Sequence, residues 1–249
     1  MVGAHDGVVN PRHALAGLGT ALLALAFLAP ATAANSAVEG EVSRALQQLA
    51  ALRTTAAAPA VSYERNYFGT SWADVDQNGC RTRDDILARD LTATTFRGSC
   101  TVMSGVLADP YAGKRERFSK ARASAIQIDH VIPLSLAWRS GASTWPAGKL
   151  AAFANDPLNL LAVDGPANQA KSDSGPSAWL PPNPKYRCTY VMRFVRVSFL
   201  YGVSIAAADR GAAKRVLHAC TTVVGHPTAM AALSPALWPH AAAFVHARP

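Results

Sequence analysis

Two polar residues interrupt an otherwise apolar run, QIDHVIPLSLAW, at positions 127–138. Asp129 and His130 lie side by side between Ile128 and Val131. Burying a carboxylate and an imidazole without partners would cost on the order of several kcal/mol, so the pair needs a ligand or polar neighbours. We therefore expect this segment to be a strand that ends in a cleft. By itself the pair is more typical of a structural polar pair inside a strand than of a catalytic site.

Candidate partners for the Asp-His pair follow within about forty residues. Asn159 lies in the apolar stretch NDPLNLLAV, and Asn168 and Lys171 lie in GPANQAKSD. Pro166 suits the first position of a helix, which would place Asn168 and Lys171 on one helical face. The order of strand, loop, strand and helix predicts a hairpin followed by a helix, which would bring these side chains to one place.

Three segments together resemble a known family. They are IDHVIPLSLAW, FANDPLNLLAVDGPANQAKSDSGPSAWLPP and the upstream FGTSWADVDQNGCRTRDDILARDL. They resemble secreted bacterial HNH endonuclease family proteins related to the C-terminal nuclease domain of GmrSD-type restriction enzymes. The resemblance covers most of residues 63–221. It implies a ββα-metal core (HNH, His-Me finger), in which a hairpin and a helix hold one divalent cation against a scissile phosphate.

The resemblance also implies a role for each polar residue. Asp129 would be a metal ligand, and His130 would be the general base that takes a proton from the attacking water. Asn159 would brace the hairpin loop or help to hold the histidine. Asn168 would be the second protein ligand of the cation, standing where the third letter of HNH has a histidine.

Phosphodiester hydrolysis requires these residue types independently of the family. An imidazole with a pKa near 6.5 accepts a proton at neutral pH, where a carboxylate is a weaker base. Oxygen ligands from Asp129 and Asn168 suit a hard cation such as Mg²⁺, with Mn²⁺ as the second candidate. Lys171 is a candidate phosphate contact, against the alternative of a solvated helix lysine. Adjacent strand residues face opposite sides, so Asp129 and His130 share one site only if the strand twists or ends there.

The surrounding pattern mixes helices with short strands. Residues 82–91 are typical of a helix, and residues 92–113 are rich in Thr, Val and Gly turns, which favours short strands. Because the two types are interspersed without a regular βαβ alternation, the sequence predicts an α+β domain embellished with helices.

Four cysteines suggest two disulfides in an exported protein: Cys80, Cys100, Cys188 and Cys220. Apolar residues at helical spacing predict helices over 189–201, ending at Gly202, and over 206–220. If these helices fold back on each other, Cys188 at the start of the first lies beside Cys220 at the end of the second. We therefore predict the pairs Cys188–Cys220 and Cys80–Cys100.

The two ends of the chain differ in composition from the middle. Residues 1–34 are typical of a secretory signal peptide, with an uncleaved membrane anchor as the alternative. Residues 35–62 predict an amphipathic helix, opened by a capping box at Ser36 and Glu39, and a linker. The nuclease domain is expected at 63–225 and an Ala/Pro-rich tail at 226–249. The protein is expected to be secreted and extracellular, without stable membrane association after cleavage.

A second acidic motif, DVDQNGCRTRDD, fits the spacing of an EF-hand calcium loop. Arg81 and Arg83 lie inside it and Cys80 is expected in a disulfide, so we favour a tight turn capped by Asx side chains. Arg83 is a candidate phosphate contact, against the alternative of a structural salt bridge.

The formal net charge of +8 favours polyanionic partners. The leading hypothesis is a secreted, metal-dependent endonuclease that cleaves DNA, with RNA as a further candidate substrate. The alternative is a non-catalytic exported module that binds nucleic acid or an acidic envelope polymer on the same scaffold. The sequence contains neither GxSxG nor HExxH, which argues against the common esterase and metallopeptidase mechanisms.

Overall fold

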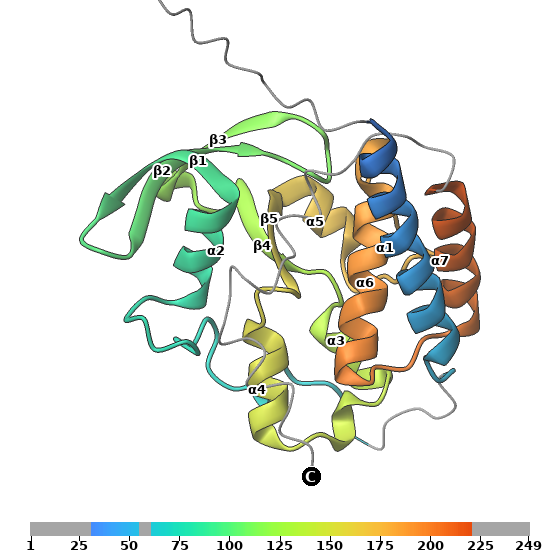
Figure 1. The fold of residues 1–249 in the computed structure, drawn as a ribbon. Helices are drawn as coiled ribbons and strands as arrows, with labels where there is room; N and C mark the ends of the chain where they lie inside the picture. Colours follow the sequence, from blue (N-terminus) through green and yellow to red (C-terminus); the bar gives the residue numbers. More distant parts are fainter. Residues whose placement is uncertain (1–30, 55–60, 221–249) are drawn as a thin grey trace, which may run out of the picture.

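The computed structural model describes residues 31–54 and 61–220 (Figure 1). Residues 1–30 of the predicted signal peptide and the predicted tail, 226–249, lie outside the described residues. The helices are α1 (Ala31–Ala51), α2 (Thr82–Asp90), α3 (Leu134–Arg139), α4 (Ala147–Asn155), α5 (Gly165–Lys171), α6 (Arg187–Tyr201) and α7 (Ala207–Cys220), with 3-10 turns η1 (Arg65–Phe68), η2 (Lys120–Arg122), η3 (Ala142–Thr144) and η4 (Pro184–Tyr186). The strands are β1 (Leu91–Arg97), β2 (Thr101–Ala108), β3 (Arg115–Ser119), β4 (Ile126–His130) and β5 (Leu160–Asp164).

The expected hairpin and helix form the centre of the molecule. Strands β4 and β5 pair antiparallel, with Ile128 opposite Ala162, and α5 follows β5 directly and packs on both strands (Figure 1). Helix α5 begins here because Asp164 caps it, accepting a hydrogen bond from the Ala167 amide at 2.8 Å. The α+β class and the ββα order of elements are confirmed.

The hairpin is buried on both faces, because each face contributes to a different hydrophobic core. One core lies between the hairpin, α2 and the sheet with strand order β1-β2-β3, and the other lies between the hairpin and the helices α3, α4 and α6. Figure 1 shows the two groups of elements on opposite sides of β4 and β5. The first core takes Ile126, Ile128, Leu160 and Ala162 from the hairpin, and the second takes Leu161 and Val163.

The two predicted disulfides are confirmed. Helices α6 and α7 form an antiparallel hairpin, and Cys188 and Cys220 are joined with their Cα atoms 5.9 Å apart. Helix α6 ends at Gly202, which adopts the left-handed conformation (φ 72°) that a residue without Cβ takes at little cost. Cys80 is joined to Cys100, which ties the loop before α2 to the turn between β1 and β2.

Helix α1 packs against α6 and α7, so it shares a core with residues beyond position 63 (Figure 1). The predicted capping box is wrong, because α1 begins at Ala31 and Ser36 lies within the helix. The run of alanines before Ser36 has high helix propensity, which continues the helix in the N-terminal direction. The predicted division into 35–62 and 63–225 stays a prediction.

The acidic loop forms the tight turn that the sequence favoured. The carboxylate of Asp74 accepts the amides of Asn78 and Gly79 at 3.1 and 2.9 Å. The Asn78 side chain accepts the Cys80 amide at 2.7 Å and donates to Asp85 at 3.2 Å. These Asx bonds satisfy the polar groups of the loop from within the loop itself.

Over residues 31–54 and 61–220, the helices are too short or too polar to span a bilayer.

Candidate active site

Asp129 points from β4 toward α5 and is buried, with 5% of its surface exposed. Its Oδ1 atom accepts a hydrogen bond from the Lys171 ammonium at 2.9 Å, and its Oδ2 atom accepts one from the Tyr111 hydroxyl at 2.6 Å. Burial raises the pKa of Asp129, while the charge of Lys171 and the bond from Tyr111 oppose this rise. The carboxylate is therefore held by a cation and a hydroxyl inside the protein.

Lys171 is fully buried at the end of α5. Its ammonium donates to Asp129 and also to the His130 carbonyl oxygen, at 2.8 Å. Both bonds join α5 to β4. With no exposed surface, the ammonium is not placed where a substrate phosphate would meet it, and Lys171 has instead the contacts of a residue that fixes the hairpin to the helix.

Asn168 lies one helical turn before Lys171 and faces the same side of β4. Its side-chain nitrogen donates to the Gln127 side chain at 2.8 Å. Gln127 and Asp129 are two residues apart in a strand, so they share a face, and α5 covers that face with Asn168 and Lys171. Within the described residues, the Oδ1 atom of Asn168 accepts no hydrogen bond, which leaves an amide oxygen on the face that carries Asp129.

The donor types on this face fit a hard divalent cation. Asp129 offers a carboxylate and Asn168 an uncommitted amide oxygen, and both suit Mg²⁺ or Mn²⁺. The Lys171 ammonium at 2.9 Å shows that the carboxylate already supports a positive charge at this position. Within residues 31–54 and 61–220, no group of three or more His, Cys, Asp or Glu side chains is placed to hold a metal. A cation would therefore rest on two protein ligands and compete with the ammonium.

His130 ends β4 and points to the face opposite Asp129, as strand alternation requires. Its Nε2 atom lies 2.8 Å from the Ala154 carbonyl oxygen of α4, and the Trp72 ring lies parallel to the imidazole with 5.9 Å between centroids. Burial lowers the pKa of His130 to about 3, with the charge of Arg65 adding to the effect and the Ala154 bond opposing it. The imidazole is therefore neutral at physiological pH.

The bond to Ala154 determines which nitrogen of His130 can accept a proton. A carbonyl oxygen only accepts hydrogen bonds, so Nε2 carries the hydrogen of the neutral ring. Nδ1 then has the free lone pair, and in the part of the chain that the structure describes it makes no hydrogen bond. This arrangement presents a neutral base at the end of the hairpin.

Asn159 is fully buried in the loop before β5. Its side-chain oxygen accepts the Ile132 amide at 2.9 Å, and its nitrogen donates to the Ile132 carbonyl at 3.3 Å. Its own carbonyl accepts the Val131 amide at 2.8 Å. These three bonds fix the chain directly after His130, which is the geometry of a residue that braces the hairpin.

Arginines that bind main-chain carbonyls also support the hairpin. Arg193 on α6 donates to the carbonyls of Pro157, Leu158 and Leu160, with distances of 2.6 to 2.8 Å. Arg83 donates to the carbonyls of Ala123 and Ile126 at 3.2 and 3.3 Å, which ties α2 to the start of β4. The expected phosphate contact of Arg83 would have to replace these two bonds.

Several residues of the site were not identified from the sequence, among them Tyr111, Gln127 and Arg193. Gln127 could have been found, because a strand residue two places before Asp129 faces the same helix. Tyr111 and Arg193 come from distant segments, and no spacing rule connects them to the hairpin.

Comparison with known proteins identifies the domain that carries this site. A family profile described as GmrSD restriction endonucleases, C-terminal domain, matches residues 81–208. An uncharacterized secreted protein of Arthroderma benhamiae is 38% identical over 180 residues, which are 72% of this chain and 85% of that protein. Because this relative is fungal, the bacterial part of the expected resemblance stays a prediction. No solved structure matches. The matched region contains the hairpin, α5 and every residue expected at the site, and the chain belongs to the family of the C-terminal domain of GmrSD restriction endonucleases.

Proposed function

We propose that the protein is an exported HNH-type endonuclease that hydrolyses phosphodiester bonds of DNA, with RNA as the second candidate substrate. One observation carries the proposal. The His130 ring is fixed by the Ala154 carbonyl at the end of a ββα hairpin, so its Nδ1 lone pair is held ready to take a proton. Membership of a restriction endonuclease domain family supports the same reaction class.

In the proposed reaction, His130 Nδ1 takes a proton from the water that attacks phosphorus. With a pKa of about 3 in the free protein, the imidazole is a weak base. A phosphodiester bound beside His130 would bring negative charge, and that charge would oppose the effect of burial and raise the pKa of His130 toward the working range. Asn159 keeps the loop after His130 in place while the proton moves.

Asp129 and Asn168 are the residues proposed to hold a divalent cation, Mg²⁺ or Mn²⁺. When bound, such a cation stabilises the negative charge that develops on the phosphate oxygens. Asp129 supplies a buried carboxylate and Asn168 a neutral amide oxygen, and Lys171 keeps α5 against β4. The alternation of strand residues separates these ligands from the His130 ring, so the substrate would have to reach around the end of β4.

We also propose that the protein is exported. The relative from Arthroderma benhamiae is named as secreted, and the N-terminal sequence is typical of a signal peptide. Two disulfides, Cys80–Cys100 and Cys188–Cys220, are expected to persist in an oxidising compartment.

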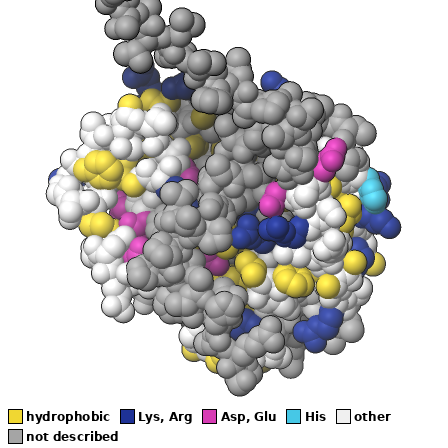
Figure 2. Space-filling model, viewed as in Figure 1, with side chains coloured by type: hydrophobic (Ala, Val, Ile, Leu, Met, Phe, Trp, Pro, Cys, Tyr) yellow, Lys and Arg dark blue, Asp and Glu magenta, His cyan; other side chains and the backbone are white. Residues whose placement is uncertain are grey.

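The second candidate function is a non-catalytic module that binds nucleic acid or an acidic polymer. The observation in its favour is the closed pair of Asp129 and Lys171, which is the arrangement of a structural ion pair. Figure 2 shows Lys and Arg side chains at several places among the described residues of this face.

Cleavage of plasmid DNA separates the two candidates. The purified protein is incubated with plasmid or RNA in Mg²⁺ or Mn²⁺, with and without EDTA. We expect cleavage that EDTA abolishes and that His130→Ala slows by about 100-fold or more, because a general base contributes about that factor. Arg215→Ala, on the exposed side of α7, is the control variant and should cleave like the wild type. Full activity of His130→Ala would refute the proposed base.

A further inference from the structure

A small pocket lies against the residues that hold His130. Its lining includes Arg65, Ser71 and Trp72 from the segment before α2, together with Ala154 and Asn155 from the end of α4. Trp72 and Ala154 are also the two contacts of the His130 ring, so a group that enters this pocket lies next to the proposed base. The free volume is about 10 Å³, which is room for one water or one amino or hydroxyl group.

Asn155, which lines the pocket, carries an unsatisfied polar atom. Asn155 is 1% exposed, and its Oδ1 atom is buried without a hydrogen-bond partner. The orientation of the amide is fixed, because its nitrogen donates to the Ala151 carbonyl at 2.9 Å. Asn155 lines the pocket, and its side-chain atom without a partner is an acceptor oxygen. A buried acceptor without a donor costs about 1 to 3 kcal/mol, so the site is built for a donor group.

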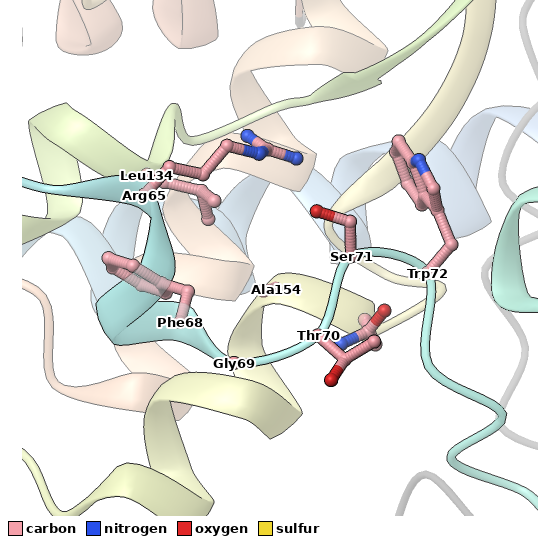
Figure 3. A pocket seen from close by; sticks show the side chains of 9 residues that line it. Arg65, Phe68, Gly69, Thr70, Ser71, Trp72, Leu134 and Ala154 are labelled. Carbon is pink, nitrogen blue, oxygen red and sulfur yellow. The ribbon is translucent and has the colours of Figure 1, made fainter.

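A cation stands at the mouth of the same pocket. Arg65 is exposed on η1, and within the described residues no carboxylate pairs with it. Figure 3 shows its guanidinium group pointing across the pocket toward the Ser71 hydroxyl, with the Trp72 ring beside them. A guanidinium with a hydroxyl nearby is a typical set of donors for a phosphate.

A nucleotide matches this combination. A phosphodiester group alone offers only acceptors, which suits Arg65 and Ser71 but leaves the Asn155 oxygen unsatisfied. A nucleotide offers an anionic phosphate and, within the same unit, an amino or hydroxyl donor on the base or sugar. The pocket volume admits one such donor group, while the phosphate stays at the mouth beside Arg65.

We propose that this pocket is a substrate subsite, in which Arg65 binds a phosphate of the nucleic acid and Asn155 accepts a hydrogen bond from the same nucleotide. The inference rests on the proposed nuclease function and adds the residues that position its substrate. Arg65 and Trp72 precede the residues matched by the family profile, which begin at position 81. The subsite therefore combines a segment upstream of the matched domain with the end of α4.

Binding is measured separately from cleavage. A fluorescein-labelled single-stranded oligonucleotide is titrated with protein in EDTA, and inorganic phosphate is added as competitor. Arg65→Gln should weaken binding about tenfold at low salt. It should also reduce the salt slope, which is the slope of the logarithm of the binding constant against the logarithm of the salt concentration, by about 0.7, the value for one phosphate contact on a single strand. Arg65→Lys should recover part of the affinity. Arg215→Gln, an exposed arginine on α7, is the matched control and should bind like the wild type.

A second variant tests the donor site. Asn155→Leu removes the buried acceptor and keeps the branching at Cγ, so it should weaken binding of the oligonucleotide but leave the competition by inorganic phosphate unchanged. Arg65→Gln should abolish that competition. Thermal unfolding of each variant checks that the fold persists, and a loss of binding that only follows a loss of fold would count against the subsite.

The outcomes distinguish the subsite from the nuclease proposal. Binding that depends on Arg65 without any cleavage would support the subsite and overturn the proposed function. Cleavage with affinity and salt slope unchanged in Arg65→Gln would overturn the subsite and leave the nuclease proposal standing. In an active enzyme the subsite also requires Arg65→Gln to raise KM more than it lowers kcat.

Discussion

The buried pair of Lys171 and Asp129 gives the sharpest test of the site. Replacing Lys171 with Met keeps the length of the side chain and removes the ammonium that bonds Asp129 at 2.9 Å. Asp129, 5% exposed in the wild type, then keeps the Tyr111 hydroxyl as its one hydrogen-bond partner among residues 31–54 and 61–220. Breaking a buried ion pair on one side costs about 3 to 5 kcal/mol, because a charge is left uncompensated. We expect a loss of this size for Lys171→Met at pH 7.

The loss should depend on pH through Asp129. Burial raises the pKa of Asp129, and Lys171 opposes that rise, so removal of Lys171 raises the pKa further. An acid with a raised folded pKa favours the folded state fully below its unfolded pKa, near 3.9, and less as pH rises through the folded pKa. The cost of Lys171→Met should therefore be smaller at pH 4 than at pH 7.

Denaturant unfolding followed by circular dichroism measures these free energies. The single variants Lys171→Met and Asp129→Asn, with the double variant, form a cycle in which we expect a coupling of at least about 2 kcal/mol. Arg215→Met on the exposed face of α7 is the control for the loss of one positive charge. A cost below about 1 kcal/mol for Lys171→Met at pH 7 would refute the description of a buried pair that joins α5 to β4.

Two further predictions concern stability. Replacing Cys188 and Cys220 with serine removes a link across 32 residues, and chain entropy then predicts a loss of about 3.7 kcal/mol in the free energy of unfolding relative to the disulfide-bonded wild type. Arg139 lowers the pKa of Asp173, so this exposed pair stabilises the fold above pH 3.8 and the contribution disappears as pH falls through the lowered pKa. Asp173→Asn should cost less than about 1 kcal/mol at pH 7 and nothing measurable at pH 2, and a larger effect at pH 2 would contradict this sign.

The parts of the fold that follow local rules could be predicted from the sequence. The period of apolar residues and Gly202 predicted α6, and the antiparallel return of α7 predicted the Cys188–Cys220 disulfide. Pro166 predicted the start of α5, which Asp164 caps in the structure. In each case neighbouring residues determine the structure, so spacing along the chain carries the information.

The rest of the site depends on contacts between distant segments. Arg193 binds carbonyls about 35 residues away, and every residue has a carbonyl, so the sequence does not indicate which one is bound. Lys171 looks like a solvated helix lysine until Tyr111 and the hairpin enclose Asp129. Alternation along β4 predicted that Asp129 and His130 diverge, but not which elements cover each face.

The hydrogen bond between His130 and the main chain of Ala154 does not depend on the side chain at position 154. The imidazole is oriented by the peptide oxygen of Ala154, not by a side chain, and all twenty amino acids supply that oxygen. Substitutions there are constrained only by the space that a buried alanine leaves. Natural or designed sequences can therefore vary at this position without changing the orientation of the His130 ring. A shift of the α4 backbone by a fraction of an ångström, in contrast, would change that orientation.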